Sequence, residues 1–245
     1  MNAEPSAAIA LAAYALVALV LVYRDLRMSG IGWRAWLLYV IERPYVGLLF
    51  HWRANRRCPF PASGPVLVMA NHSSPVDPML VWMNHHLGKG PSRFRVIGFL
   101  TAKEYYDVPG LHWICTTMRS IPLVRGGKDI APVREALRRL RSGHAVGVFP
   151  EGRINRTDQL FEANTGVAWL ALKARVRVYP VFVDNAPGGR NMVEPFVTPS
   201  RVYVVYGDPV DLSRYYGRRV SHKLLGEVTQ ILMTHLESLR PKTAP

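Results

Sequence analysis

The chain has 245 residues, with 31 Lys and Arg against 17 Asp and Glu and a formal net charge of +14. This length can bury one good hydrophobic core, so we expect a single main domain with an appendage. Such a positive charge implies an anionic partner. Nucleic acid is the generic candidate, but the basic residues are scattered and no nucleic-acid-binding motif is present. Anionic phospholipid, a phosphorylated substrate or an acidic co-substrate fits the charge better.

The first feature along the chain is an unbroken apolar run over residues 7–23. Its length is at the short end of what crosses a bilayer. Glu4 precedes the run, and Arg24 and Arg27 follow it. This is the reverse of a signal peptide, so we do not expect cleavage. The basic flank predicts a membrane-bound protein whose remaining chain lies on the cytoplasmic side.

A second stretch, residues 31–52, mixes apolar residues with aromatic and charged ones: Trp33, Arg34, Trp36, Tyr39, Glu42, Arg43, Tyr45 and Trp52. This composition suits the headgroup zone of a membrane, although a buried amphipathic helix covering the main domain is the alternative. Gly30 and Gly32 separate it from the first run, and Pro44 is expected to kink a long helix. We therefore expect residues 1–52 to form a two-helix anchor that spans once or dips into one leaflet, and residues 53–245 to form the main domain.

From Pro59 onward, strand and helix patterns alternate. Strands are predicted at 66–70, 95–100, 145–149, 176–183 and 201–206, and helices at 79–87, 130–140, 166–174 and 222–239. This alternation predicts an α/β fold with a central, largely parallel sheet flanked by helices. Functional loops in such folds follow the carboxyl ends of the strands. Residues 184–199, rich in Gly, Pro and Asn, are predicted to form an exposed excursion near them.

The most informative motif follows the first of these strands and reads N-H-S-S-P-V-D over residues 71–77. It places His72 and Asp77 five positions apart in a turn that Pro75 stiffens. A histidine accepts a proton well near neutral pH, and a carboxylate on its other ring nitrogen fixes the tautomer. The pair suits removal of a hydroxyl proton during attack on a thioester. This spacing alone is common in loops. Asp77 could also cap the next helix, and both roles can hold, since one carboxylate can accept from a backbone amide and from His72.

Three further motifs follow in order: I-P-L-V-R over 121–125, G-V-F-P-E-G-R over 147–153 and V-Y-P-V over 178–181. With the first, they resemble the four blocks of the glycerolipid acyltransferase family, typified by 1-acylglycerol-3-phosphate acyltransferases. Those blocks read N-H-x-S-x-x-D, I-P-V-x-R, F-P-E-G-T-R and V-x-P-V. The resemblance covers roughly residues 48–212. This chain departs from it in reading E-G-R-I-N, so that Arg153 comes one position early, and in having Arg119 where a glycine is common.

The resemblance implies direct transfer of a fatty acyl group from acyl-CoA or acyl carrier protein to a hydroxyl of a glycerol-phosphate-type lipid, with lysophosphatidate as the first candidate. His72 would be the general base and Asp77 its orienting carboxylate. The implied substrate-binding residues are Asn71, Ser73, Lys103, Arg125, Glu151, Gly152 and Arg153. No metal or bound cofactor is implied, since the thioester is a co-substrate.

Within this set, the cationic Lys103, Arg125 and Arg153 are candidates for holding the phosphate, and the guanidinium of Arg125 offers a planar fork of donors. Glu151 would bind the acceptor or orient a cationic neighbour, and Gly152 would allow close backbone approach. Backbone amides near Ser73 would stabilise the oxyanion.

Two alternatives remain open at this point. One is the same chemistry on another acceptor, such as an ornithine lipid, another lysolipid or a polyketide-like alcohol. The other is a non-catalytic lipid-binding membrane protein, which would have no need of a base and its orienting carboxylate. His85 and His86 show no metal-ligand spacing. Cys58 and Cys115 lack metal or redox spacing, so we expect free thiols in a reducing compartment.

Overall fold

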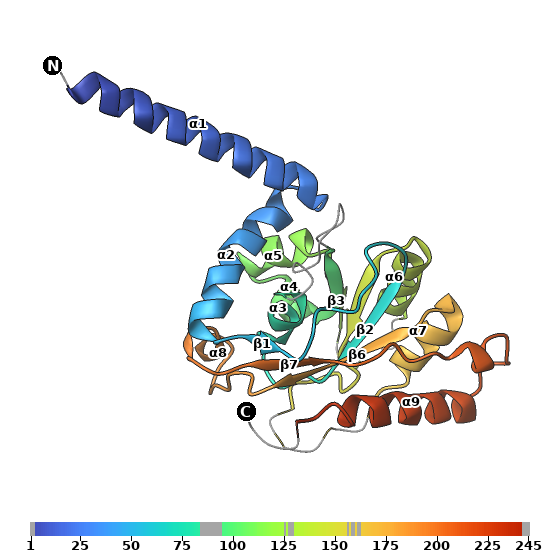
Figure 1. Cartoon of the computed structure of the whole chain (residues 1–245). Coiled ribbons are helices and arrows are strands. Elements are labelled where there is room, and N and C mark those ends of the chain that lie inside the picture. Colours follow the sequence, from blue (N-terminus) through green and yellow to red (C-terminus); the bar gives the residue numbers. More distant parts are fainter. Residues whose placement is uncertain are drawn as a thin grey trace.

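The computed structural model describes residues 3–83, 95–124, 126, 130–155, 157, 160 and 163–241. Two long helices come first, α1 (Ala3–Ser29) and α2 (Trp33–Leu49) (Figure 1). Gly30 and Gly32 separate them, with φ of 69° and 84°, a left-handed backbone that glycine adopts without steric cost. The predicted break is therefore confirmed. Across the bend, the Trp36 indole donates a hydrogen bond of 2.9 Å to Asp25 Oδ2 and joins the two helices.

The described strands form one sheet in the order β1-β7-β6-β2-β5-β3-β4. Their bounds are β1 (Arg53–Ala54), β2 (Val66–Ala70), β3 (Ile97–Ala102), β4 (Ile121–Leu123), β5 (Ala145–Val148), β6 (Val178–Asp184) and β7 (Tyr203–Tyr206). All neighbouring pairs are parallel except β6 and β7, which run antiparallel. The predicted, largely parallel sheet is confirmed.

Helices cover both faces of this sheet (Figure 1). Alternate residues of β2 enter two cores: Val66, Val68 and Ala70 pack with α2 and α3 (Asp77–Trp82), and Leu67 and Met69 pack on the other face. That second core contains α6 (Ala131–Arg141), α7 (Gly166–Ala174) and α9 (His222–Glu237). A strand buried on both faces explains why β2 reads as a continuous apolar run rather than an alternating one.

Most predicted elements lie within a few residues of their observed bounds, and α7 matches its predicted range. Helix α3 begins at Asp77, earlier than expected, and the end of the predicted 79–87 helix, with His85 and His86, lies outside the described residues. The short elements β1, β4, α4 (Lys103–Tyr106), α5 (Leu111–Thr117), α8 (Glu194–Val197) and the 3-10 turn Ser213–Tyr215 were not predicted. Helix α2 continues through Pro44 without a break.

The N-terminal helices differ in how they meet the domain. Within α1, the segment Ala7–Ser29 contains an 18-residue stretch with a mean hydropathy of 2.1, none of which is buried. Among the described helices, α1 alone is long and apolar enough to cross a membrane. This suggests membrane association. Helix α2 instead buries Leu38, Tyr39 and Val46 in the core beside β2, so one face of it belongs to the α/β domain.

Candidate active site

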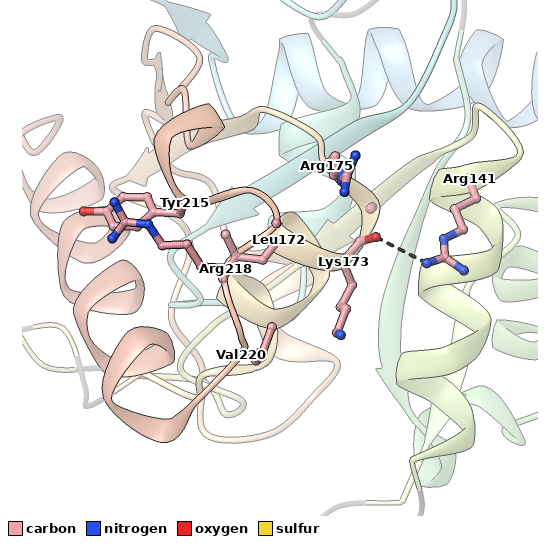
Figure 2. Close-up of a pocket in the computed structure, with 9 residues that line it drawn as sticks. Arg141, Leu172, Lys173, Arg175, Tyr215, Arg218 and Val220 are labelled. Atoms are coloured by element: carbon pink, nitrogen blue, oxygen red, sulfur yellow. Dashed lines mark hydrogen bonds between the residues drawn. The ribbon is translucent and has the colours of Figure 1, made fainter.

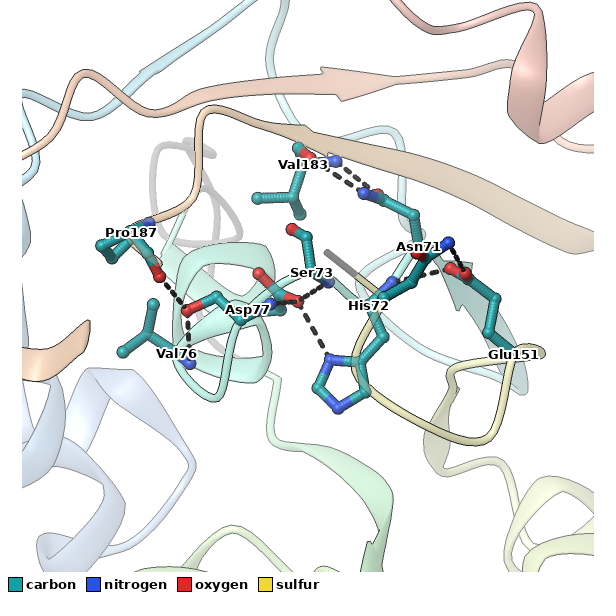
Figure 3. A network of polar contacts seen from close by, with 10 residues as sticks. Asn71, His72, Ser73, Val76, Asp77, Glu151, Val183 and Pro187 are labelled. Atoms are coloured by element: carbon teal, nitrogen blue, oxygen red, sulfur yellow. Dashed lines mark hydrogen bonds and ion pairs between the residues drawn. The ribbon is translucent and has the colours of Figure 1, made fainter. Parts of the chain in front are cut away.

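Loops that follow three neighbouring strands meet at the carboxyl ends of those strands (Figure 3). Asn71 directly follows β2, Glu151 lies shortly after β5, and the chain from β6 passes Pro187. Strands β5, β2 and β6 are parallel neighbours, so their carboxyl ends lie together. The expectation that the His72 and Glu151 loops face each other is therefore confirmed.

His72 and Asp77 form a hydrogen-bonded pair, with 3.0 Å between His72 Nδ1 and Asp77 Oδ2. An ionised carboxylate only accepts, so Nδ1 carries the proton and the lone pair lies on Nε2. The Asp77 side chain is fully buried, whereas the His72 side chain is 16% exposed. A histidine held in this tautomer, with Nε2 directed away from its partner, has the geometry of a general base (Figure 3).

Asp77 also organises the turn that carries the base. Its Oδ2 accepts from the main-chain N–H groups of Ser73 at 2.7 Å and Ser74 at 2.8 Å. The alternative that Asp77 caps the following helix is wrong, because these amides lie before α3 and the helix start has no side-chain cap. The oxyanion role expected of the amides near Ser73 is also not supported, since Asp77 already occupies the amides of Ser73 and Ser74.

The loop after β5 holds the main chain of His72 on both sides. Glu151 Oε1 accepts from the His72 N–H at 3.1 Å, and the Asn155 N–H donates to the His72 carbonyl at 2.6 Å. Asn155 Nδ2 also donates to Glu151 Oε2 at 2.6 Å. Glu151 and Asn155 are both buried, with 5% and 4% exposure. We call these two residues the main-chain clamp; sequence reasoning missed Asn155.

A second set of contacts ties the base loop to β6 and the chain after it. The Asn71 amide bonds the main chain of Val183 twice, donating to its carbonyl at 2.9 Å and accepting from its N–H at 2.7 Å. Ser74 Oγ donates to the Pro187 carbonyl at 2.7 Å. Asn71 is buried, so the contacts seen are structural, and its predicted contact with substrate stays a prediction.

Aromatic rings support the base from behind. The His72 ring stacks on Phe149 with 4.1 Å between centroids, and Phe149 stacks on Phe99 at 5.0 Å. A Cβ at Gly147 would lie 2.3 Å from the Phe99 ring, so glycine is needed there for this close approach. The stacked column limits rotation of the imidazole.

The other predicted substrate residues lie around the carboxyl ends of the strands. Lys103 follows β3 and pairs with Asp107 at 2.5 Å, while Arg153 is exposed beside Gly152. Gly152 has φ 68°, and a Cβ there would meet the Asn164 amide at 2.9 Å. Arg125 lies outside the described residues. The Ser73 hydroxyl is buried and has no hydrogen-bond partner among the described residues.

Two features lie away from this site. Arg119 precedes β4, at the amino ends of the strands, whereas the site lies at their carboxyl ends. It lines a hollow with Gly64 and His144 and not the base loop. A separate cavity of about 490 Å³ is lined by basic residues that include Arg141 and Lys173, which Figure 2 labels. These two lie in the last turns of α6 and α7, where positive charge balances the helix dipole.

Neither cysteine is arranged as a nucleophile. Cys58 and Cys115 are free thiols, as expected. Burial raises the pKa of Cys58 to about 12 and raises the pKa of Cys115. Because the thiolate is the reactive form, both thiols are poorly suited to covalent catalysis near neutral pH.

Comparison with known proteins adds a family match. Residues 53–184 match the family model described as Acyltransferase. The chain is 27% identical over 168 residues to an N-acylphosphatidylethanolamine synthase of Arabidopsis thaliana, covering 62% of this chain and 57% of the relative. It is 27% identical over 105 residues to glycerol-3-phosphate O-acyltransferase 1 of Saccharomyces cerevisiae, covering 41% of this chain and 14% of that protein.

The fold also resembles a solved structure, that of the 1-acyl-sn-glycerophosphate (LPA) acyltransferase PlsC from Thermotoga maritima. The TM-score is 0.62 at 23% identity, and the match covers 86% of this chain and 83% of the other. The chain thus spans 57% and 14% of the lengths of the two curated relatives but most of the PlsC structure.

Proposed function

Since this chain belongs to the Acyltransferase family, we propose that it is a membrane-associated O-acyltransferase acting on a glycerol-phosphate-type lipid, with lysophosphatidate as the first candidate acceptor. The observation that carries the proposal is the His72–Asp77 pair, a buried carboxylate holding the tautomer of a partly exposed imidazole. The donor would be a fatty acyl thioester of coenzyme A or of acyl carrier protein. The α/β domain would lie on the cytoplasmic side.

The chemistry proposed is a direct transfer. His72 Nε2 takes the proton of the acceptor hydroxyl as its oxygen attacks the thioester carbonyl carbon. The new C–O bond forms, the C–S bond breaks, and the imidazolium returns its proton to the departing thiolate. Asp77 stabilises the imidazolium between these steps. A substrate oxygen thus takes the role of a serine in hydrolases, and no acyl-enzyme is formed.

Recognition of the acceptor phosphate is assigned to Lys103, Arg125 and Arg153. Lys103 and Arg153 are exposed, and both come shortly after strands that end at the site. A charge-assisted contact to phosphate is among the stronger polar contacts a protein makes. The ion pair between Lys103 and Asp107 is solvent-exposed, so a phosphate can replace Asp107 as the partner at little cost.

A different acceptor is the second candidate. The relative from Arabidopsis thaliana is named for synthesis of an N-acylated phospholipid, and it matches more of this chain than the yeast glycerol-3-phosphate acyltransferase does. The E-G-R-I-N sequence over 151–155, in which Ile154 occupies the usual arginine position, also lies in the loop that adjoins the base. Ornithine lipids, other lysolipids and amine-bearing phospholipids are therefore included as acceptors to be tested.

The test uses the full chain in vesicles, with acyl-CoA and acyl carrier protein thioesters each offered with a panel of acceptors. The panel contains lysophosphatidate, glycerol 3-phosphate, other lysolipids, an ornithine lipid and an amine-bearing phospholipid. Thiol release and the mass of the lipid product are measured, with His72→Ala as the background. We expect release dependent on a phosphate-bearing acceptor. Binding of lipid without thiol release from either donor would favour the non-catalytic alternative and overturn the proposal.

A further inference from the structure

The short helix α8 lies in the excursion after β6 and has a rigid local structure. Asn191 Oδ1 accepts from the N–H groups of Val193 and Glu194, both at 2.9 Å. Thr198 Oγ1 donates to the Glu194 carbonyl at 2.8 Å, at the other end of the turn. This one-turn helix is therefore held at both ends by side-chain hydrogen bonds.

The apolar residues of α8 divide between core and solvent. Pro195 is buried, and Phe196 packs against the core that contains β2. Val193 and Val197 are instead 69% and 67% exposed. A single exposed valine needs no explanation, so the meaning of this pair depends on the surface beside it.

The surface beside Val193 and Val197 is formed by α2, which lies next to α8 (Figure 1). The Tyr45 hydroxyl donates to the Phe196 carbonyl, and the Ser200 N–H donates to the Leu49 carbonyl at 3.2 Å. Away from its buried side, α2 exposes an apolar stripe made of Trp33, Leu37, Ile41 and Leu48. Spacings of four and seven residues place these side chains on one helix face.

The charges around this surface favour an anionic partner. Arginines on or next to the two helices are exposed: Arg34, Arg43, Arg53, Arg190 and Arg201. The two carboxylates of α2 and α8 are less available. Glu42 Oε2 is fully buried, and Glu194 Oε2 accepts from the Arg190 N–H at 2.6 Å. A stripe of apolar side chains bordered by arginines matches the boundary between acyl chains and anionic headgroups.

We propose that α8 is a membrane contact, in which Val193 and Val197 continue the α2 stripe into one leaflet of an anionic bilayer. The same excursion reaches the base loop through the hydrogen bond from Ser74 Oγ to the Pro187 carbonyl. Resting α8 on the bilayer therefore places the loop of His72 beside the membrane surface. The membrane contact rests on the proposed function in one respect only, which is that the site is taken to meet its lipid acceptor at the membrane surface.

A depth measurement tests the contact without requiring turnover. The full chain, with Cys58→Ser and Cys115→Ser, carries a single spin label at Val197→Cys in vesicles of phosphatidylglycerol and phosphatidylcholine. The matched control is Thr234→Cys on the exposed face of α9. We expect the Val197 label to be relaxed more by oxygen than by a water-soluble nickel chelate, at a depth of about 5–10 Å, and the Thr234 label to show the reverse. A spin label at Val193→Cys gives a second, independent measurement of the depth of α8.

Equal nickel accessibility at Val197 and Thr234 would overturn the proposal. Spin–spin broadening that grows with protein density would also overturn it, because a second copy of the chain would then cover α8. A functional arm uses Val193→Asp with Val197→Asp, expected to lower turnover several-fold on acceptor in vesicles but not on acceptor in detergent micelles. If no variant or wild-type protein shows thiol release, the proposed function fails while the depth result stands.

Discussion

The carboxylate of Glu151 accepts a hydrogen bond from the main-chain N–H of His72, so an acidic residue after β5 holds the base-bearing loop after β2. Its other oxygen accepts from Asn155, whose own N–H bonds the His72 carbonyl. The resemblance assigns Glu151 to substrate binding, whereas these contacts suit it to positioning. The two roles have different kinetic consequences.

For the main-chain clamp, Glu151→Ala should lower kcat by about 10–100-fold and leave the KM of the acceptor nearly unchanged. The physical reason is that a displacement of the base by a fraction of an ångström is costly, although no substrate contact has been removed. Asn155→Ala should do the same to a smaller extent, and Glu237→Ala on α9 serves as the control. A higher acceptor KM with kcat preserved would instead assign Glu151 to substrate binding.

For the base, His72→Ala should remove nearly all acyl transfer, because among the described residues no other histidine is paired with a carboxylate. Asp77→Asn should cut kcat by roughly 10³–10⁴-fold through loss of tautomer control, as in other histidine–carboxylate pairs. The exposed His235 on α9 gives the matched control, His235→Ala, which should be silent. Circular dichroism checks folding, since Asp77 also bonds two amides. Normal turnover by well-folded His72→Ala protein would exclude the mechanism.

For the phosphate, Arg125→Ala should raise the KM of the acceptor about tenfold or more and spare that of the donor, since a charge-assisted contact is lost. Arg119→Ala is the matched control. Arg119 is an exposed arginine close to Arg125 in sequence, but it lies at the amino ends of the strands, away from the site. Its substitution should therefore leave both KM values unchanged. A rise confined to the donor KM would place Arg125 on the coenzyme side.

The pairing of His72 with Asp77 and the central sheet could be predicted from sequence, because each leaves a local pattern. His72 and Asp77 lie in one turn, and β2, β5 and β6 are apolar runs of strand length. Asn155 could not be found in this way, because its role depends on a contact to His72 more than eighty positions earlier in the chain.

The short elements could not be predicted from the sequence for a related reason. Strand β1 contains two residues and is defined by its pairing with β7, a partner about 150 positions away. The apolar residues of α8 carry no helical period, and the side chains of Asn191 and Thr198 support it through hydrogen bonds at its two ends. The oxyanion expectation is not supported for Ser73 and Ser74, because Asp77 already bonds their amides, and the sequence does not show these contacts.

Stability should depend on pH through Glu42. Burial raises the pKa of this carboxyl to about 8, and its Oε2 has no hydrogen-bond partner among the described residues. The folded state therefore holds a proton that the unfolded state releases near pH 4.5, so stability falls as pH rises from about 4.5 to 8.

Glu42→Gln removes this titration. It should raise the free energy of unfolding by on the order of 1–2 kcal/mol at pH 8 and change it little at pH 5. Thermal unfolding of the full chain in detergent at the two pH values gives the comparison, with Glu237→Gln as the exposed control. Equal effects of Glu42→Gln at both pH values would show that the carboxyl ionises normally in the folded protein.

The last prediction concerns α1. Because residues 7–23 of α1 are apolar and exposed, they should hold the full chain on vesicles through high-salt washes that remove electrostatic binders. Arg24→Gln with Arg27→Gln should change this retention little. Leu16→Arg with Val20→Arg should weaken it, since a charge at the centre of an apolar helix costs roughly 2.5–3.5 kcal/mol on insertion scales. Sedimentation before and after salt measures both. If high salt alone releases the wild-type protein, the arginines rather than the apolar helix hold it on the membrane, and α1 is not an anchor.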